Sequence, residues 1–148
     1  ANGGTVYRPR MVSEFRRPDG GHSFVARPQA VGRLPISPEY LELVRLGMHD
    51  VVHGEDGTAS EAQTPMIELA GKTGTAEVGS GEARYNNTWF VCFGPFTNPR
   101  YALAVLVERG ISGGKTAAPI ARAFFDRYLK VIEADPTTAA LDRATQPQ

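Results

Sequence analysis

The sequence predicts an α/β fold of the α+β type, in which helices flank an antiparallel sheet. Three segments rich in β-forming residues follow one another at 67–78, 88–93 and 101–108, with only nine and then seven residues between them. These connections are too short for the helical crossovers that parallel strands need, so we expect an antiparallel meander. Segments with helical periodicity stand on either side, at 38–53 and 117–133. A length of 148 residues suits one domain.

Charge and composition exclude several classes of function. The 16 basic and 16 acidic side chains give a formal net charge of zero, and no run of like charges occurs. A nucleic-acid partner or a polybasic membrane surface is therefore not expected. The longest apolar runs, such as 101–107, stop far short of the roughly 18 residues that cross a bilayer. The one cysteine, Cys92, rules out an internal disulfide and a structural zinc site built on cysteines.

The first 36 residues are typical of a chain entered partway through a fold. They open on Asn2-Gly3-Gly4 with no preceding element, and residues 11–36 mix charges with frequent proline and glycine. This composition allows short strands at most, which we place at 11–15 and 22–27. We therefore expect an irregular excursion or a hairpin here.

A helix is predicted over 38–53. Ser37 is a candidate N-cap, Pro38 suits the first helical position, and Glu39 places an acid in the first turn. Gly54 supplies the stop. The apolar residues at helical spacing are Leu41, Val44, Met48 and Val51.

The later elements should pack in layers. Because 88–93 and 101–108 are continuously apolar, we expect strands buried on both faces, with a layer above and a layer below the sheet. The last helix, 117–133, should pack on the sheet through one apolar face. That face carries Ile120, Phe124, Tyr128 and Val131 or Ile132. The remainder, 134–148, is rich in Thr, Ala, Pro and Gln and is expected to be a disordered tail.

The residues with the most suggestive chemistry lie in the first of the three strands, as Lys72-Thr73-Gly74-Thr75. In a regular strand Lys72 and Gly74 point to one face and Thr73 and Thr75 to the other, although a local twist could turn both hydroxyls toward a ligand. Gly74 has no side chain, so the backbone of another molecule can lie close to it, and an edge strand pairs naturally with an extended peptide. The segment suits the binding of an acidic peptide end.

A second glycine-rich segment, 110–116, raises the alternative of a phosphate-binding loop because it ends in Gly114-Lys115-Thr116. Its glycine spacing is one residue too short for that motif, and Pro119 would lie in the phosphate-binding turn. We therefore interpret these glycines as a tight bend between the last strand and the last helix.

Five stretches of the sequence carry a resemblance to a known family: 1–9, 69–77, 88–95, 104–108 and 117–122. They resemble the C-terminal part of a penicillin-binding protein transpeptidase domain, and are most similar to the monofunctional class B enzymes of the elongation type. The resemblance implies that residues 1–133 are the C-terminal part of that domain. It also implies the penicillin-binding protein and serine β-lactamase-like fold, with no cofactor and no metal.

The resemblance implies acyl transfer through a serine ester on a stem peptide ending in acyl-D-Ala-D-Ala, the group that β-lactams imitate. Lys72 would hold its ammonium in the cleft, tune proton transfer and attract the substrate carboxylate. The hydroxyls of Thr73 and Thr75 would bind that carboxylate, and the backbone N–H of Thr75 would supply one of two oxyanion-hole donors. Gly74 would allow close approach.

The same resemblance implies a bacterial location, in the periplasm or on the outer face of the inner membrane. Anchoring would come from an N-terminal segment that this chain does not contain. The implied partners are the stem peptide, β-lactams, the N-terminal half of the domain and other cell-wall elongation proteins.

Two of the family's three motifs are missing from this pattern. The only Ser-x-x-Lys is Ser112 to Lys115, which follows Lys72 although the family places its nucleophile earlier, and no Ser-x-Asn occurs. A serine in a flexible bend without a rigidly held base is an ordinary hydroxyl. We therefore expect the chain alone to be inactive. Two alternatives stay open: a noncatalytic peptide- or protein-binding module of the same fold, and a fragment of a serine β-lactamase or β-lactam sensor.

His49 and His53 lie four apart on the predicted helix, a spacing at which two imidazoles can share a zinc ion. No glutamate follows His49 as in zinc proteases, and a cationic residue near a helix C-terminus is favourable in itself. We therefore prefer a solvated helix end.

Three further expectations concern the strands and the loop between them. Trp89 is expected in the core, and Cys92 is expected there as an inert thiol. The loop 79–87 should lie beside the Lys-Thr-Gly strand, so its last residues, Tyr85 to Asn87, are candidate substrate contacts.

Overall fold

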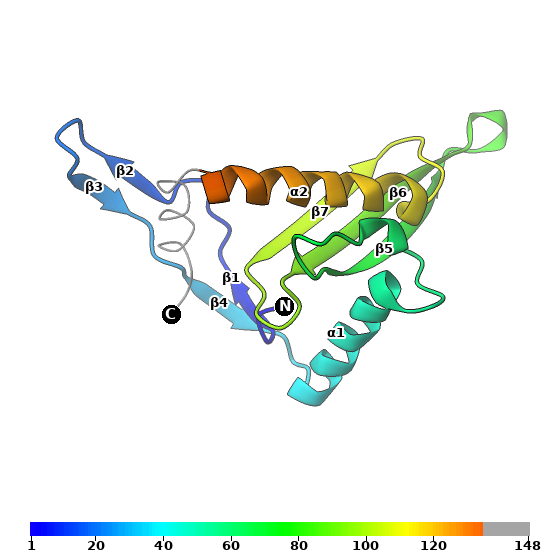
Figure 1. Ribbon diagram of the computed structural model, residues 1–148, viewed down its shortest axis with the longest axis horizontal. Helices are drawn as coiled ribbons and strands as arrows, with labels where there is room; N and C mark the ends of the chain where they lie inside the picture. The colour runs from blue at the N-terminus through cyan, green and yellow to red at the C-terminus, as the bar shows by residue number, and fades with distance from the viewer. Residues whose placement is uncertain (135–148) are drawn as a thin grey trace.

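The central sheet of the molecule is an antiparallel meander. The structure is a computed structural model that describes residues 1–134. Strands β5 (Ala70–Val78), β6 (Tyr85–Gly94) and β7 (Tyr101–Val107) form a sheet in the order β5-β6-β7 (Figure 1). The β5–β6 register is unbroken from Ala70 opposite Phe93 to Val78 opposite Tyr85. The predicted α+β fold with an antiparallel meander is confirmed.

Helix α1 (Pro38–His53) begins after Ser37 and ends before Gly54, as predicted. The Ser37 side chain makes no capping bond to the backbone; its hydroxyl instead hydrogen-bonds the carboxyl of Glu39 and lowers the pKa of that group. Within α1 only Val52 is fully buried, and the main contact of the helix with the sheet is with β5.

Helix α2 (Ala118–Ala134) covers the sheet through a face that matches our prediction only in part, since of its predicted residues only Ile132, one of two alternatives, is buried. Its buried side chains are Ala118, Ala121, Phe125 and Ile132. Ile120, Phe124 and Val131, which we expected to pack on the sheet, are about half exposed. The alanines explain the difference, because small side chains let the helix backbone approach its neighbours closely, and the bulky residues then rotate outward. The predicted tail lies outside the described residues, apart from Ala134.

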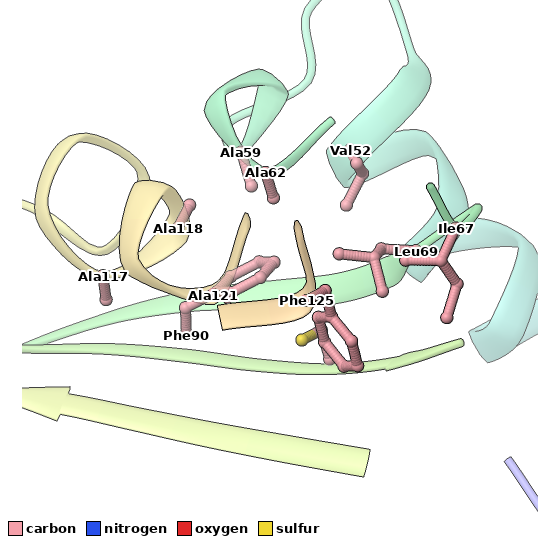
Figure 2. Close-up of a cluster of buried hydrophobic side chains, with 11 residues drawn as sticks. Val52, Ala59, Ala62, Ile67, Leu69, Phe90, Ala117, Ala118, Ala121 and Phe125 are labelled. Carbon is pink, nitrogen blue, oxygen red and sulfur yellow. The ribbon is translucent and has the colours of Figure 1, made fainter. Parts of the chain in front are cut away.

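The hydrophobic core lies between α2 and the sheet. It brings together Phe90 from β6, Leu69 from the residue before β5, Val52 from α1 and Ala62 from the short η1 turn (Ser60–Ala62). Figure 2 shows these side chains pointing toward one another from the sheet, α2 and η1. A hydrogen bond from the Thr64 hydroxyl to Asp126 ties the segment after η1 to α2. The core therefore joins α2, η1 and the C-terminal end of α1 to one face of the sheet.

The other side of the sheet is mostly open, so the expectation of two covered faces is wrong for the described residues. Trp89 is 40%, Val91 41% and Leu106 45% exposed, whereas Thr88 and Phe90, which alternate with the first two along β6, are fully buried. These three apolar side chains form what we call the open face. A continuously apolar strand has apolar side chains on both of its faces, but the pattern does not show which face is covered by another element. The expectation that Trp89 lies in the core is wrong for the same reason.

Helix α1 covers one end of this second face. The Arg45 guanidinium lies 5.8 Å from the centre of the Phe93 ring, and Ala70, which is opposite Phe93 in the register, is also fully buried. Beyond this pair the open face begins. The sheet therefore has one complete layer, α2, and one partial layer, α1.

The N-terminal quarter of the chain forms an arm that projects away from the sheet (Figure 1). It consists of two antiparallel pairs: β1 (Thr5–Tyr7) with β4 (Ala30–Arg33), and β2 (Glu14–Arg16) with β3 (His22–Val25). The inner hairpin β2–β3 is the excursion that the sequence predicts. The β1–β4 pair was not predicted, because each strand is very short and next to proline or glycine.

The arm joins the body at Gly4. Gly4 is buried with a φ of +88°, and a Cβ built on it would stand 3.1 Å from Cδ1 of Leu41. Its carbonyl accepts the backbone N–H of Leu34 at 2.8 Å. Only glycine combines that backbone conformation with so little space.

Cys92 is buried beneath α2, and burial raises the pKa of its thiol to about 12. About one molecule in ten thousand is then a thiolate at pH 8, the form that alkylating reagents attack. We expect iodoacetamide to leave Cys92 unmodified in the folded protein at pH 8 and to modify it once urea unfolds the chain. Mass spectrometry measures both, and equal rates in the two states would contradict the expectation.

The raised pKa of the Cys92 thiol also makes the stability of the fold depend on pH. The folded state holds the thiol protonated. The contribution of Cys92 to the free energy of unfolding is therefore fully present below the unfolded pKa of 9.0, and it is lost as the pH rises from there toward about 12. A Cys92→Ala variant, which has no thiol to titrate, should lose less stability over that alkaline range.

Candidate functional site

The Lys-Thr-Gly segment occupies the middle of β5, at an edge of the sheet. Among the described strands β5 pairs only with β6, so its outer backbone groups face away from the sheet. Lys72 is opposite Val91 and Gly74 is opposite Trp89, which puts both on the open face, while Thr73 and Thr75 belong to the face that α2 covers. The predicted alternation is thus present in the structure. An exposed strand edge offers N–H and C=O groups to an extended peptide.

Lys72 holds its ammonium at this edge. The side chain is exposed, and Nζ donates a hydrogen bond to the carbonyl oxygen of Thr73 at 2.8 Å. An ammonium has three donors, so two more are available to a ligand. Lys72 therefore provides a local positive charge beside the strand, in a chain whose formal net charge is zero.

The two threonine hydroxyls have different surroundings. Thr75 is exposed, whereas Thr73 is half-buried and its Oγ1 lies 3.0 Å from Oγ1 of Thr58, in the loop after α1. Sequence reasoning missed Thr58, since the loop 57–65 carries no recognisable motif and the two threonines are 15 positions apart. Only the folding of β5 against this loop brings them together.

A glycine turn supports the strand from the covered face. The segment η3 (Gly113–Ala117), a short π-helical turn, lies directly over the pairing of Gly74 with Trp89. A Cβ built on Gly113 would stand 2.3 Å from the Trp89 carbonyl oxygen and 2.9 Å from the Gly74 nitrogen. No real side chain tolerates such contacts, so Gly113 is required for the close approach.

Ser112, the only serine in a Ser-x-x-Lys pattern, has a structural role in this turn. Its hydroxyl accepts the backbone N–H of Lys115 at 3.2 Å and caps η3. The backbone N–H of Ile111 donates in turn to the Thr116 hydroxyl at 3.1 Å. Two N–H groups that a phosphate loop would aim at its ligand are thus used inside the turn. These contacts agree with the predicted bend.

The two histidines of α1 anchor the start of β5; His53 is exposed, as expected for a solvated helix end, whereas His49 is half-buried. Nε2 of His49 lies 3.0 Å from the Glu68 carboxylate, and Nε2 of His53 lies 3.0 Å from the Leu69 carbonyl oxygen. The two rings stack with their centres 4.5 Å apart. Within residues 1–134 no group of three or more potential metal ligands occurs. The histidines therefore fix where β5 begins, two residues before the Lys-Thr-Gly segment.

The loop between β5 and β6 is shorter than the predicted 79–87. Tyr85, Asn86 and Asn87 are the first residues of β6 and pair with the end of β5, because polar cross-strand pairs extend the hairpin beyond its apolar part. Near the tip Arg84 pairs with Glu77 at 3.3 Å. The role of these three residues as substrate contacts stays a prediction.

A hollow of about 350 Å³ lies between the end of α1 and the loop that follows it, and Thr58 is one of its lining residues. Its lining includes the acids Asp50 and Asp56. These carboxylates would repel an anionic peptide end, so the β5 edge with Lys72 is the better candidate site for an anion.

The edge strand of this α+β sheet carries the lysine, the two hydroxyls and the glycine on which the resemblance to a transpeptidase domain partly rests. A family model described as the penicillin-binding protein transpeptidase domain matches residues 1–126. The chain therefore belongs to the penicillin-binding protein transpeptidase family.

The similar proteins include two curated relatives. One is the peptidoglycan D,D-transpeptidase PbpA of Mycobacterium tuberculosis, 34% identical over 140 residues, which covers 88% of this chain and 27% of the relative. Another is the peptidoglycan D,D-transpeptidase MrdA of Acinetobacter baumannii, 30% identical over 154 residues, covering 95% and 22%. Both names fit the predicted resemblance to class B enzymes. The chain spans about a quarter of the length of these relatives.

A solved structure gives the same result. Penicillin-binding protein A of M. tuberculosis, crystallised as an imipenem acyl-enzyme complex, matches with a TM-score of 0.69 and 32% identity, covering 86% of this chain and 28% of that one. In residues 1–134, none of the helices has the length and apolarity to cross a membrane.

Proposed function

We propose that this chain is the part of a peptidoglycan D,D-transpeptidase that presents the Lys-Thr-Gly strand to the substrate, while the serine nucleophile comes from another part of the whole protein. The reaction is the cross-linking of stem peptides through a serine ester, and β-lactams acylate the same serine. Residues 1–133 form the C-terminal part of the transpeptidase domain in this proposal.

The single observation that carries the proposal is the position of Lys72 to Thr75 on an exposed strand edge. A stem peptide ending in acyl-D-Ala-D-Ala carries a carboxylate, and this edge offers an ammonium on one face of the strand and two hydroxyls on the other, at neighbouring positions. The same edge can pair with the peptide backbone. Lys72 and Thr75 are the proposed catalytic residues, with the N–H of Thr75 as an oxyanion-hole donor, and Thr73, Gly74 and Thr75 are the proposed substrate-binding residues.

The absence of a nucleophile from this chain is the finer part of the proposal. The only Ser-x-x-Lys places its serine as the cap of η3, where Oγ accepts a backbone N–H. A nucleophilic serine needs a base that removes its proton. Ser112 is bonded to the backbone of Lys115 rather than to its amine, which supports a structural role.

The proposed location follows from the proposed reaction. Peptidoglycan lies outside the cytoplasm of bacteria, so a stem-peptide cross-linking enzyme must work there. Other cell-wall elongation proteins are proposed partners on the same ground.

Labelling with a fluorescent penicillin tests this function. We expect covalent labelling of the whole protein, on a serine outside residues 1–148, and none of the chain alone. Mixing the chain with the remaining part of the domain should restore labelling if the two pieces assemble.

Each other outcome points elsewhere. Labelling of the chain alone at Ser112 would show that the nucleophile is present. A whole protein that never reacts would favour a noncatalytic peptide-binding module built on the same edge strand. Rapid turnover of a chromogenic cephalosporin would favour a β-lactamase.

A further inference from the structure

Two segments meet the Lys-Thr-Gly strand β5 at Thr73, on the face that α2 covers. They are the loop at Thr58 and η3 at Gly114. Oγ1 of Thr58 lies 3.0 Å from Oγ1 of Thr73. A Cβ built on Gly114 would stand 2.0 Å from the Thr58 carbonyl oxygen and 3.9 Å from Cγ2 of Thr73. The backbone of Gly114 is therefore in direct contact with Thr58, and the turn presses the loop toward the strand.

The direction of the bond between the two hydroxyls decides what Thr73 can offer to a ligand. A hydroxyl has one proton to donate and two lone pairs that accept. If Thr58 donates to Thr73, the Thr73 proton remains free for an anion. If Thr73 donates to Thr58, it presents only a lone pair, which a carboxylate repels.

A bound carboxylate selects the first arrangement. The chain of hydrogen bonds then runs from Thr58 to Thr73 to the carboxylate, and each bond polarises the next. A hydrogen bond to an ionised acceptor is about twice as strong as one between neutral groups, so the effect of Thr58 is largest on a charged ligand.

We propose that Thr58 is a positioning residue of this site, which orients the Thr73 hydroxyl so that it donates to the carboxylate of the substrate. The Gly113–Gly114 backbone of η3 contacts both Thr58 and β5 and keeps the two hydroxyls at hydrogen-bonding distance. The inference rests on the proposed function, since it assumes that Thr73 binds the carboxylate.

The test uses the whole protein and two forms of one β-lactam, benzylpenicillin and its uncharged methyl ester. Thr58→Val keeps the shape of the side chain and removes the hydroxyl. We expect it to slow acylation by benzylpenicillin about 5- to 10-fold and acylation by the ester less than about 2-fold, because the Thr73 hydroxyl loses the donor that orients and polarises it toward the charged carboxylate. Thr58→Ser, which keeps the hydroxyl, should restore the wild-type ratio of the two rates.

Gly114→Ala is the second variant. It leaves every hydroxyl in place but displaces the Thr58 carbonyl, so it should shift the acid-to-ester ratio in the same direction as Thr58→Val. Thermal unfolding of each variant shows whether it is folded at the assay temperature.

The outcomes separate this inference from the proposed function. If the wild-type protein reacts and Thr58→Val slows both ligands equally, or neither, the positioning role is wrong while the proposed function stands. If the wild-type protein does not react with either ligand, the proposed function fails and this inference fails with it.

Discussion

Replacing Phe125 with alanine is expected to lower the free energy of unfolding by about 3–5 kcal/mol, the usual cost of emptying a fully buried phenylalanine site. The Phe125 side chain is 0% exposed and lies in the core between α2 and the sheet (Figure 2). The neighbouring alanines of α2 are too small to fill the space left behind. Urea unfolding followed by circular dichroism measures the change.

Phe124 is the matched control, since it is the same residue type one position earlier and is 45% exposed. Phe124→Ala should cost about 1 kcal/mol or less, because little apolar area leaves the core. The predicted helix face would have given the opposite order. Equal losses for the two variants, or a larger loss at Phe124, would contradict the packing described here.

Replacing Lys72 with alanine in the whole protein is expected to slow acylation by benzylpenicillin about 100- to 1,000-fold, the scale on which a preorganised electrostatic group in an active site acts. The ammonium of Lys72 lies at the β5 edge, fixed by the Thr73 carbonyl. In the proposed function, its removal takes away the positive charge that attracts the carboxylate and assists proton transfer. Stopped-flow or gel measurement of the acylation rate gives the result.

Lys115 provides the control for this variant. It is also exposed, but it lies in η3 next to Ser112. Lys115→Ala should change the rate by less than about twofold, as is usual for an exposed residue away from the reacting groups. If instead Lys115→Ala abolished acylation and Lys72→Ala did not, the catalytic pair would be Ser112 and Lys115, and our assignment of the site would be wrong.

Local signals in the sequence predicted the elements well. Ser37, Pro38 and Gly54 marked the ends of α1, and the short connections determined that the strands run antiparallel. The Lys72-to-Thr75 alternation also followed from the period of a strand. Each of these properties depends on residues that are neighbours in the chain.

The errors arose wherever the answer depended on a distant neighbour. The buried face of α2 depends on how closely Ala118 and Ala121 let the helix approach the sheet. The spacing of apolar residues along the helix does not include that distance. The contact between Thr58 and Thr73 requires the loop, the strand and η3 to be placed together. Trp89 was expected in the core because its segment is apolar, yet no described element covers it.

The N-terminal arm has a consequence for how the protein unfolds. No residue from 5 to 33 is buried, and the arm meets the body through Gly4 and Leu34. The dependence of unfolding free energy on denaturant concentration scales with the surface that unfolding exposes, and the arm exposes little that is not already in water. We therefore expect denaturant unfolding to report mainly on residues 34–134. Substitutions in the arm can accumulate without lowering the stability of the sheet that carries Lys72.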